Sequence, residues 1–221
     1  MTWISSTHLP LTVPLLPLDG HVLLPAASTP FRVSDHRHRA IVHDLLERPL
    51  DQRWLAVPAR ATLDVSDDLG TLGLMTIATP LAGGDYIIVI EGRSACRLEP
   101  LPTVEPDTRL YRHVHARHLA DRPEPLHDAR RQTTQLVQAL FSLYDAFLLA
   151  ATELPASDHG VDDAGLVYRI GAAVLEDPRA RVELLAERCP ASRRQMILRV
   201  IADQLAFAQR EGLLGRGVTS C

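Results

Sequence analysis

The hydrophobic pattern of this chain changes its period at one segment, D-R-P-E-P, which spans Asp121 to Pro125. Before this segment, short apolar runs are separated by turn residues, and Arg109 to Leu119 alternates residue by residue, which predicts a strand with one face toward solvent. After it, apolar residues recur every three or four positions, which predicts helices. We therefore expect an α+β chain with a β-rich subdomain over residues 1–120, a helical bundle over residues 126–211 and a flexible tail over residues 212–221.

The β-rich part opens with V-P-L-L-P-L-D-G-H-V-L-L-P, from Val13 to Pro25. Proline fixes φ and lacks an N–H, so this stretch is expected to form two extended segments, Thr12 to Pro17 and His21 to Leu24. A helix from about Asp35 to Leu46, capped by Ser34 or Asp35, should follow. Gly83-Gly84-Asp85 is typical of a hairpin turn. Further strands are predicted at Trp54 to Val57, Leu69 to Ala78, Tyr86 to Ile90 and Ala95 to Leu101.

Four helices are expected after the linker, and their bounds follow from capping signals. They run from about Leu126 to Thr152, from Asp163, from Asp177-Pro178, and from about Pro190 to Glu211. Two arginine pairs, Arg130-Arg131 and Arg193-Arg194, are expected on solvated helix faces, with an acidic partner as the alternative.

Composition excludes several chemistries, because the chain contains no lysine and no asparagine, and its 23 basic residues are all arginine. A Walker A loop and a serine–lysine dyad both need lysine, and a papain-like set needs asparagine. The net charge of −4 gives no general attraction to nucleic acid. No apolar run approaches the roughly 20 residues that cross a bilayer, and the N-terminus lacks the basic region of a signal peptide, so we expect a cytoplasmic protein without membrane contact.

Short sequence motifs then occur in a specific order. They are Pro14-Leu15 with Pro17-Leu18, Val22 to Pro25, Pro30 to Arg37, Leu69-Gly70-Thr71, Gly83-Gly84-Asp85 and Val89 to Gly92. In this order they resemble the N-terminal substrate-binding domain of Lon proteases, a domain also found as a free-standing protein and in cereblon. The chain departs from that family where Ala26 replaces a glycine, where His36 and His38 replace a proline and a tyrosine, and where Ala95 replaces an arginine.

The resemblance implies a twisted, mostly antiparallel β pseudo-barrel beside a four-helix bundle. It also implies a non-catalytic module without cofactor that recognises apolar segments of unfolded or tagged polypeptides, or an adaptor for a separate ATP-dependent protease or chaperone. The ATPase and peptidase of full-length Lon would not fit within this length. Aromatic rings are the side chains we expect at such a site, with core packing as the alternative for each. The candidates in the β-rich part are Phe31, Trp54, Tyr86 and Tyr111.

Two other functions remain open from the sequence. The first is a small metal-dependent enzyme that uses His113, His115 and His118, of which the first two share a strand face and the third points the other way. A solvated strand face is the favoured interpretation of these histidines. His36, His38 and His43 are expected to be exposed on the first helix, and Cys96 to be a core residue. The second alternative is a structural or regulatory oligomer, such as a homodimer.

Overall fold

The computed structural model describes residues 12–18, 20–60, 68–101, 110–147 and 163–211. They form two compact units. The first consists of residues 1–120 and 177–186, and the second of residues 121–176 and 187–221. The boundary between the two units after Ala120 coincides with the start of the linker segment. Residues 177–186, which we expected in the helical bundle, belong to the same unit as the β-rich part. The predicted tail over residues 212–221 and the end of the first bundle helix lie outside the described residues.

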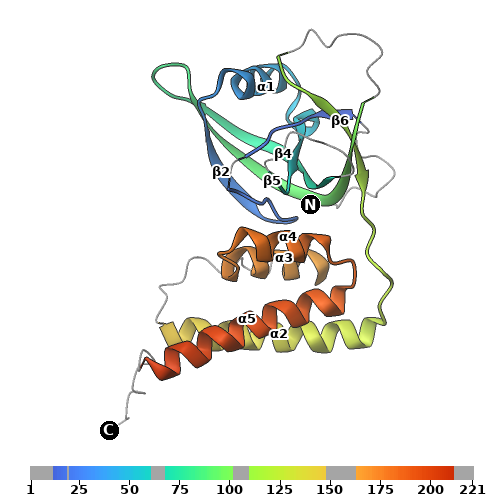
Figure 1. The fold of residues 1–221 in the computed structure, drawn as a ribbon, viewed down its shortest axis with the longest axis vertical. Helices are drawn as coiled ribbons and strands as arrows, with labels where there is room; N and C mark the ends of the chain where they lie inside the picture. Colours follow the sequence, from blue (N-terminus) through green and yellow to red (C-terminus); the bar gives the residue numbers. More distant parts are fainter. Residues whose placement is uncertain (1–11, 19, 61–67, 102–109, 148–162, 212–221) are drawn as a thin grey trace. The chain divides into compact units, whose positions relative to one another are not determined.

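The first unit is built on one six-stranded antiparallel sheet with the strand order β1-β6-β5-β4-β3, in which β2 pairs with β5 beside this path (Figure 1). An isolated bridge between Leu15 and Ala56 joins the two end strands, but the sheet is not closed into a barrel. The α+β class is therefore confirmed, without barrel closure. The strands are β1 Thr12–Pro14, β2 Ser28–Val33, β3 Trp54–Pro58, β4 Asp68–Pro80, β5 Tyr86–Pro100 and β6 His113–His118.

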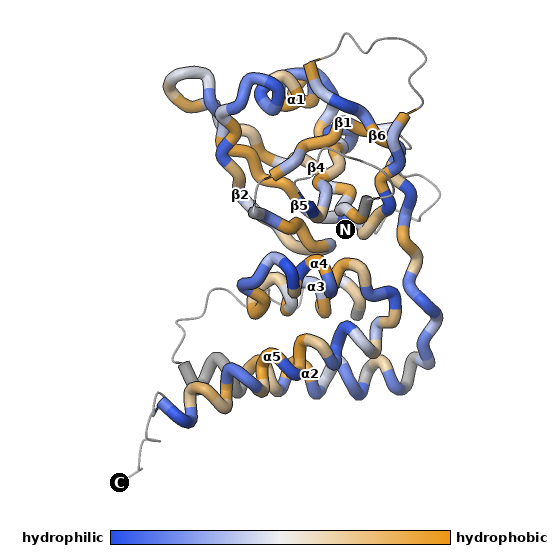
Figure 2. The backbone as a smooth tube through the Cα atoms, viewed as in Figure 1, coloured by the Kyte–Doolittle hydropathy of each residue, from blue (hydrophilic) through white to orange (hydrophobic). Residues whose placement is uncertain are grey.

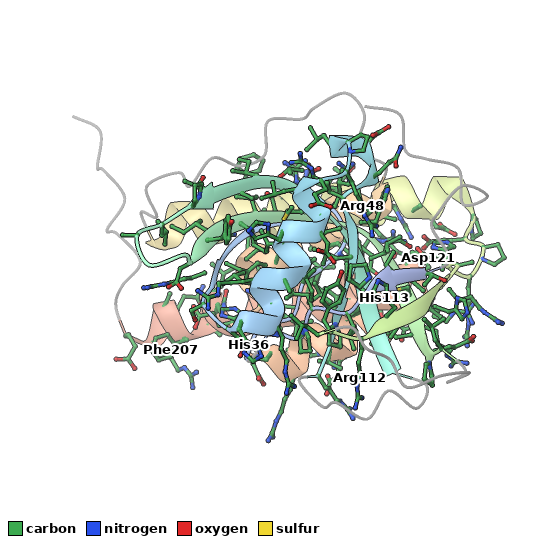
Figure 3. All side chains as sticks on the ribbon, turned by 90° about the horizontal axis from the view of Figure 1, so that it is seen from above. His36, Arg48, Arg112, His113, Asp121 and Phe207 are labelled. Atoms are coloured by element: carbon green, nitrogen blue, oxygen red, sulfur yellow. The ribbon has the colours of Figure 1, made fainter. Side chains whose placement is uncertain are left out.

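Helix α1, His36–Leu46, covers one face of this sheet and begins where the sequence predicts. The side chain of Asp35 accepts hydrogen bonds from the backbone N–H groups of Arg37 and His38, which are orphan donors of the first turn. Figure 3 shows the helix lying across the sheet, with His36 and Arg48 near its two ends. Its buried face packs with strand residues into one core cluster that includes Ile41, Val42, Leu45, Phe31, Met75, Ile88 and Ile90.

The second core cluster lies on the opposite face of the sheet, because successive residues of β3 point to opposite sides. Leu55 and Val57 belong to the first cluster, whereas Trp54 and Ala56 belong to the second. Cys96 is part of the second cluster, as expected, and burial raises the pKa of its thiol to about 12. Two short helices complete this unit, η2 Leu50–Gln52 and α4 Pro178–Ala186.

The segment around Gly92 departs from the sequence-based prediction. The expected break between two strands is absent, and β5 runs continuously through Gly92. The backbone N–H of Ala26 donates to the Gly92 carbonyl, and the Gly92 N–H donates to the Ala27 carbonyl, both at 2.8 Å. His21 to Leu24 is not a strand, and the strand that follows it in the chain is β2, which the sequence analysis missed.

Ala26 is the one described non-glycine residue with a positive φ, at 59°. It stands where the resemblance places a glycine, and an L-residue pays about 1 kcal/mol or more for this left-handed conformation. We therefore expect Ala26→Gly to raise the free energy of unfolding by about 1 kcal/mol. Urea denaturation followed by tryptophan fluorescence would measure this change, and an unchanged or lower stability would contradict it.

The second unit contains helices α2 Leu126–Phe147, α3 Asp163–Val174 and α5 Pro190–Arg210, which pack on one another. Their buried apolar side chains form the core of this unit: Leu136, Leu140, Val167, Ile170, Ile197 and Ile201. The four predicted helices all exist. None of the described helices is long and apolar enough to span a membrane.

Candidate functional site

The outer face of strands β2, β5 and β4 is the candidate site, and the strand register defines it. Pro30 pairs with Val89, and Val89 pairs with Ile77 on its other side. Two residues further along, Arg32 pairs with Ile87, and Ile87 pairs with Thr79. Directly opposed residues of antiparallel strands share a face, and so do residues two apart. These six residues, which we call the outer face, therefore form two rows of three: Pro30, Val89, Ile77 and Arg32, Ile87, Thr79.

The outer face is mostly apolar and open to solvent. Ile77 is 53% exposed and Ile87 is 40% exposed. The register of β4 against β5 shifts between Met75 and Ile77, so that Met75 is buried and Ile77 faces outward. The strand neighbours of the two isoleucines face the first core cluster, in which Ile88 is fully buried and against which Ala78 and Tyr86 are partly buried. Figure 2 shows hydrophobic colouring along β4 and β5. Two large isoleucines at diagonal positions on adjacent strands, both on the solvent side of the sheet, form a surface that an apolar ligand can cover.

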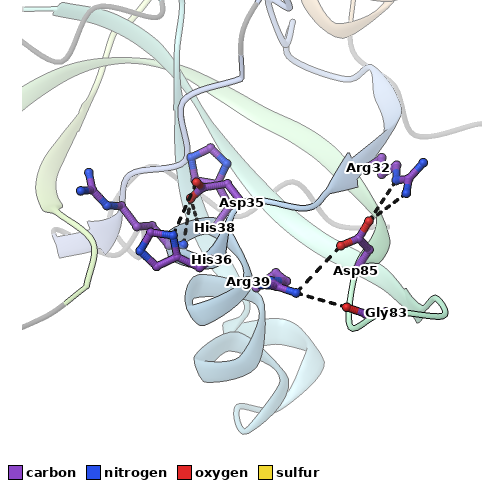
Figure 4. A network of polar contacts seen from close by, with 8 residues as sticks. Arg32, Asp35, His36, His38, Arg39, Gly83 and Asp85 are labelled. Carbon is purple, nitrogen blue, oxygen red and sulfur yellow. Dashed lines mark hydrogen bonds and ion pairs between the residues drawn. The ribbon is translucent and has the colours of Figure 1, made fainter.

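A polar network lies at one end of the outer face, at the turn between β4 and β5 (Figure 4). Arg32 donates to the Asp85 carboxylate through Nε at 3.2 Å and Nη2 at 2.9 Å. Arg39, from α1, lies 3.9 Å from the other oxygen of Asp85 and donates to the Gly83 carbonyl at 3.4 Å. Two guanidinium groups from different elements therefore share one carboxylate.

The four aromatic candidates lie elsewhere. Phe31 and Trp54 are 6% and 8% exposed, and the Trp54 indole N–H donates to the Asp51 carbonyl at 2.8 Å. Tyr86 and Tyr111 are half-buried against the first core cluster, and the Tyr111 hydroxyl donates to the Asp44 carboxylate. The structure thus brings Tyr86 and Tyr111 to the same cluster but places none of the four rings on the outer face.

Ile77 and Ile87 are not among the site residues predicted from the sequence. A signal was present, because the run Tyr86 to Ile90 is apolar at every position, whereas an antiparallel strand with one solvated face should alternate. An uninterrupted run in a hairpin strand means that both faces are apolar. The core covers one of these faces, and the other is exposed at Ile87.

The histidines of β6 each have separate surroundings. His115 lies 3.1 Å from the Thr12 hydroxyl, His118 lies 2.5 Å from the Ser94 hydroxyl, and the His113 ring packs on Tyr111. Desolvation of its ring lowers the pKa of His118. Within the described ranges, no group of three or more His, Cys, Asp or Glu side chains is placed to hold a metal ion. The metal-enzyme alternative therefore has no support from this part of the chain.

Arg193 and Arg194 contradict the prediction of a solvated face, because both are only 1% exposed. Each pairs with a carboxylate of the linker segment, Arg193 with Asp121 and Arg194 with Glu124. The Arg193 guanidinium also lies 4.6 Å above the Tyr168 ring, and burial lowers the pKa of Arg193 to about 10, which leaves it charged at neutral pH. The carboxylates that neutralise both arginines belong to the chain itself.

Comparisons with known proteins agree with this architecture. Residues 12–203 match the family model of the ATP-dependent protease La (LON) substrate-binding domain. The N-terminal domain of the Mycobacterium avium complex Lon protease is similar in structure, with a TM-score of 0.64 at 18% identity over 88% of this chain and 98% of that one. A Lon N-terminal domain protein from Xanthomonas campestris has a TM-score of 0.53 at 19% identity, over 85% of this chain and 97% of that one. No curated protein matches.

The fold and the family match define a substrate-binding class of domain, in which polypeptides are the substrates. The chain belongs to the Lon substrate-binding domain family. The comparisons find this non-catalytic domain of Lon along the chain and no protease domain.

Proposed function

We propose that the outer face binds apolar segments of polypeptides that are exposed in unfolded or tagged proteins. The observation that carries this proposal is the exposure of Ile77 and Ile87, which are diagonal neighbours on the solvent face of adjacent strands. Membership of the Lon substrate-binding family supplies polypeptide as the ligand class. The exposed isoleucines supply a reason why such a ligand would bind here, because covering them removes apolar surface from water.

The geometry suits an extended segment. The two rows of the outer face lie two residues apart along the strands, which is about 7 Å, and the three strands span about 10 Å. A bound chain can therefore set successive same-side residues against Ile77 and Ile87. Phe31 and Trp54 would support the strands from within, since their burial keeps them from direct contact.

Replacement of both exposed isoleucines by serine tests this proposal. We expect the Ile77→Ser/Ile87→Ser variant to bind an uncharged apolar peptide about tenfold more weakly, because each side chain loses part of the stabilisation from burying an aliphatic group. Fluorescence anisotropy of a labelled peptide would measure the affinity. Both substituted positions are exposed, so the fold should be retained, and circular dichroism would check this.

A matched control is Leu50→Ser, because Leu50 belongs to the same unit and has the same 53% exposure as Ile77. Its substitution should leave the affinity unchanged. An undiminished affinity in the double variant would exclude the outer face as the binding surface, and so would an equal loss in the Leu50 variant.

A further inference from the structure

Positive charge gathers at the end of the outer face that carries Arg32. Arg32 occupies the same row as Ile87, and its side chain is 70% exposed although it pairs with Asp85. Asp85 is only 16% exposed and is shared with Arg39. One carboxylate that two guanidinium groups share leaves the network positive, and the more exposed of the two groups is the one beside Ile87.

The start of α1 adds to this charge. It reads His36, Arg37, His38, Arg39, and no acidic residue lies in its first turn. Cations at the amino end of a helix are unfavourable, because the helix dipole is positive there. Figure 4 shows this end of α1 facing the turn that holds Gly83 and Asp85. Asp35 offsets part of this charge by capping the helix, and Arg39 from this turn reaches Asp85.

The basic cluster, as we define it, consists of Arg32 and Arg39. Both guanidinium groups pair with the Asp85 carboxylate. Two arginines therefore face one carboxylate, so the cluster is positive, whereas the whole chain has a net charge of −4. The positive charge is local to this end of the outer face.

We propose that the preferred ligand is a polypeptide segment in which apolar residues are followed closely by Asp or Glu. This inference rests on the proposed function and adds the substrate class. Apolar side chains cover Ile77 and Ile87, and a carboxylate about two residues further along an extended chain reaches Arg32. Arginine is well suited to this contact, because its planar guanidinium offers paired donors to a carboxylate.

The test uses three labelled peptides of about ten residues with one shared apolar sequence and a flank of Asp-Glu, Ser-Ser or Arg-Arg. We expect the acidic peptide to bind about fivefold more tightly than the neutral one in about 50 mM salt, since partly exposed ion pairs contribute modestly. This advantage should shrink in about 300 mM salt, because the pairs are screened. The basic peptide should bind most weakly.

Substitutions test whether the basic cluster causes the tighter binding of the acidic peptide. Arg32→Gln should abolish the advantage of the acidic peptide, so that the variant binds the acidic and the neutral peptide with equal affinity. Asp85→Asn should increase the advantage, because it removes the shared carboxylate. Arg60→Gln is the control, since Arg60 is exposed in the same unit outside the cluster, and it should change nothing.

The outcomes separate the two proposals. If the neutral peptide binds and the acidic flank gives no advantage, this inference fails and the proposed function stands. If no apolar peptide binds with any flank, the proposed function fails. If a single-stranded oligonucleotide competes as well as the acidic peptide, the cluster attracts any polyanion, and recognition of an acidic polypeptide is overturned.

Discussion

Gly92→Ala should destabilise the first unit by roughly 3 kcal/mol or more. A Cβ at this position would lie 2.2 Å from the Leu24 carbonyl oxygen and 3.2 Å from the Pro25 Cα. Both obstacles are backbone atoms, which a rotamer change cannot move. If the backbone moved away to relieve this clash, the two hydrogen bonds that join Ala26 and Ala27 to Gly92 would break.

The measurement is urea denaturation followed by tryptophan fluorescence, since both tryptophans, Trp3 and Trp54, lie in the first 120 residues. Gly20→Ala is the matched control. Gly20 has a φ of 72° and no atom within 4 Å of an added Cβ, so its substitution costs only the left-handed strain of about 1 kcal/mol. Equal losses of stability in the two variants would show that a Cβ at Gly92 does not clash with the backbone of Leu24 and Pro25.

Arg194→Ala should destabilise the second unit by about 3 kcal/mol, because it leaves the Glu124 carboxylate without its guanidinium partner. Glu124 is only 13% exposed, and Gln132 would lose the hydrogen bond that Arg194 donates at 3.2 Å. The urea midpoint followed by the helical circular dichroism signal would report the loss. Arg199→Ala, at an exposed position of the same helix, should change the free energy of unfolding by less than about 0.5 kcal/mol.

A double variant separates the loss of the pair from the burial of an unpaired charge. Arg194→Met/Glu124→Leu removes both charges and keeps apolar volume, so it should regain most of the stability that Arg194→Ala loses. A double variant as unstable as Arg194→Ala would mean that the ion pair itself contributes the stability. A single variant as stable as the wild type would contradict the buried geometry of Arg194.

Much of the fold could be predicted from the sequence, because the hydrophobic period and the capping residues are local signals. The N-cap Asp35 and the hairpin turn at Gly83-Gly84 fall where they were expected. The continuous strand β5 could not be predicted, because a glycine within a run of strand residues usually indicates the end of a strand. Here the glycine is needed because another backbone segment packs directly against it. That segment, at Leu24, lies far away in the sequence.

The candidate site was harder to predict for the same reason. Exposure of Ile77 depends on which strand lies beside it and on which face the core forms, and neither is a local property. Arg193 and Arg194 were expected in solvent because charged pairs on helices usually lie there. Their burial depends on carboxylates about 70 residues earlier, which come close only in the folded chain.

The most direct test of the outer face as a polypeptide-binding surface is methyl NMR of the isoleucine side chains during titration with an uncharged apolar peptide. Each isoleucine is a separate probe, and the chain carries its own controls. The methyl signals of Ile77 and Ile87 should shift or broaden first, whereas those of Ile88 and Ile90, on the buried face of the same strand, should change less. Shifts at Ile197 and Ile201 of the second unit, with Ile77 and Ile87 unchanged, would contradict the account.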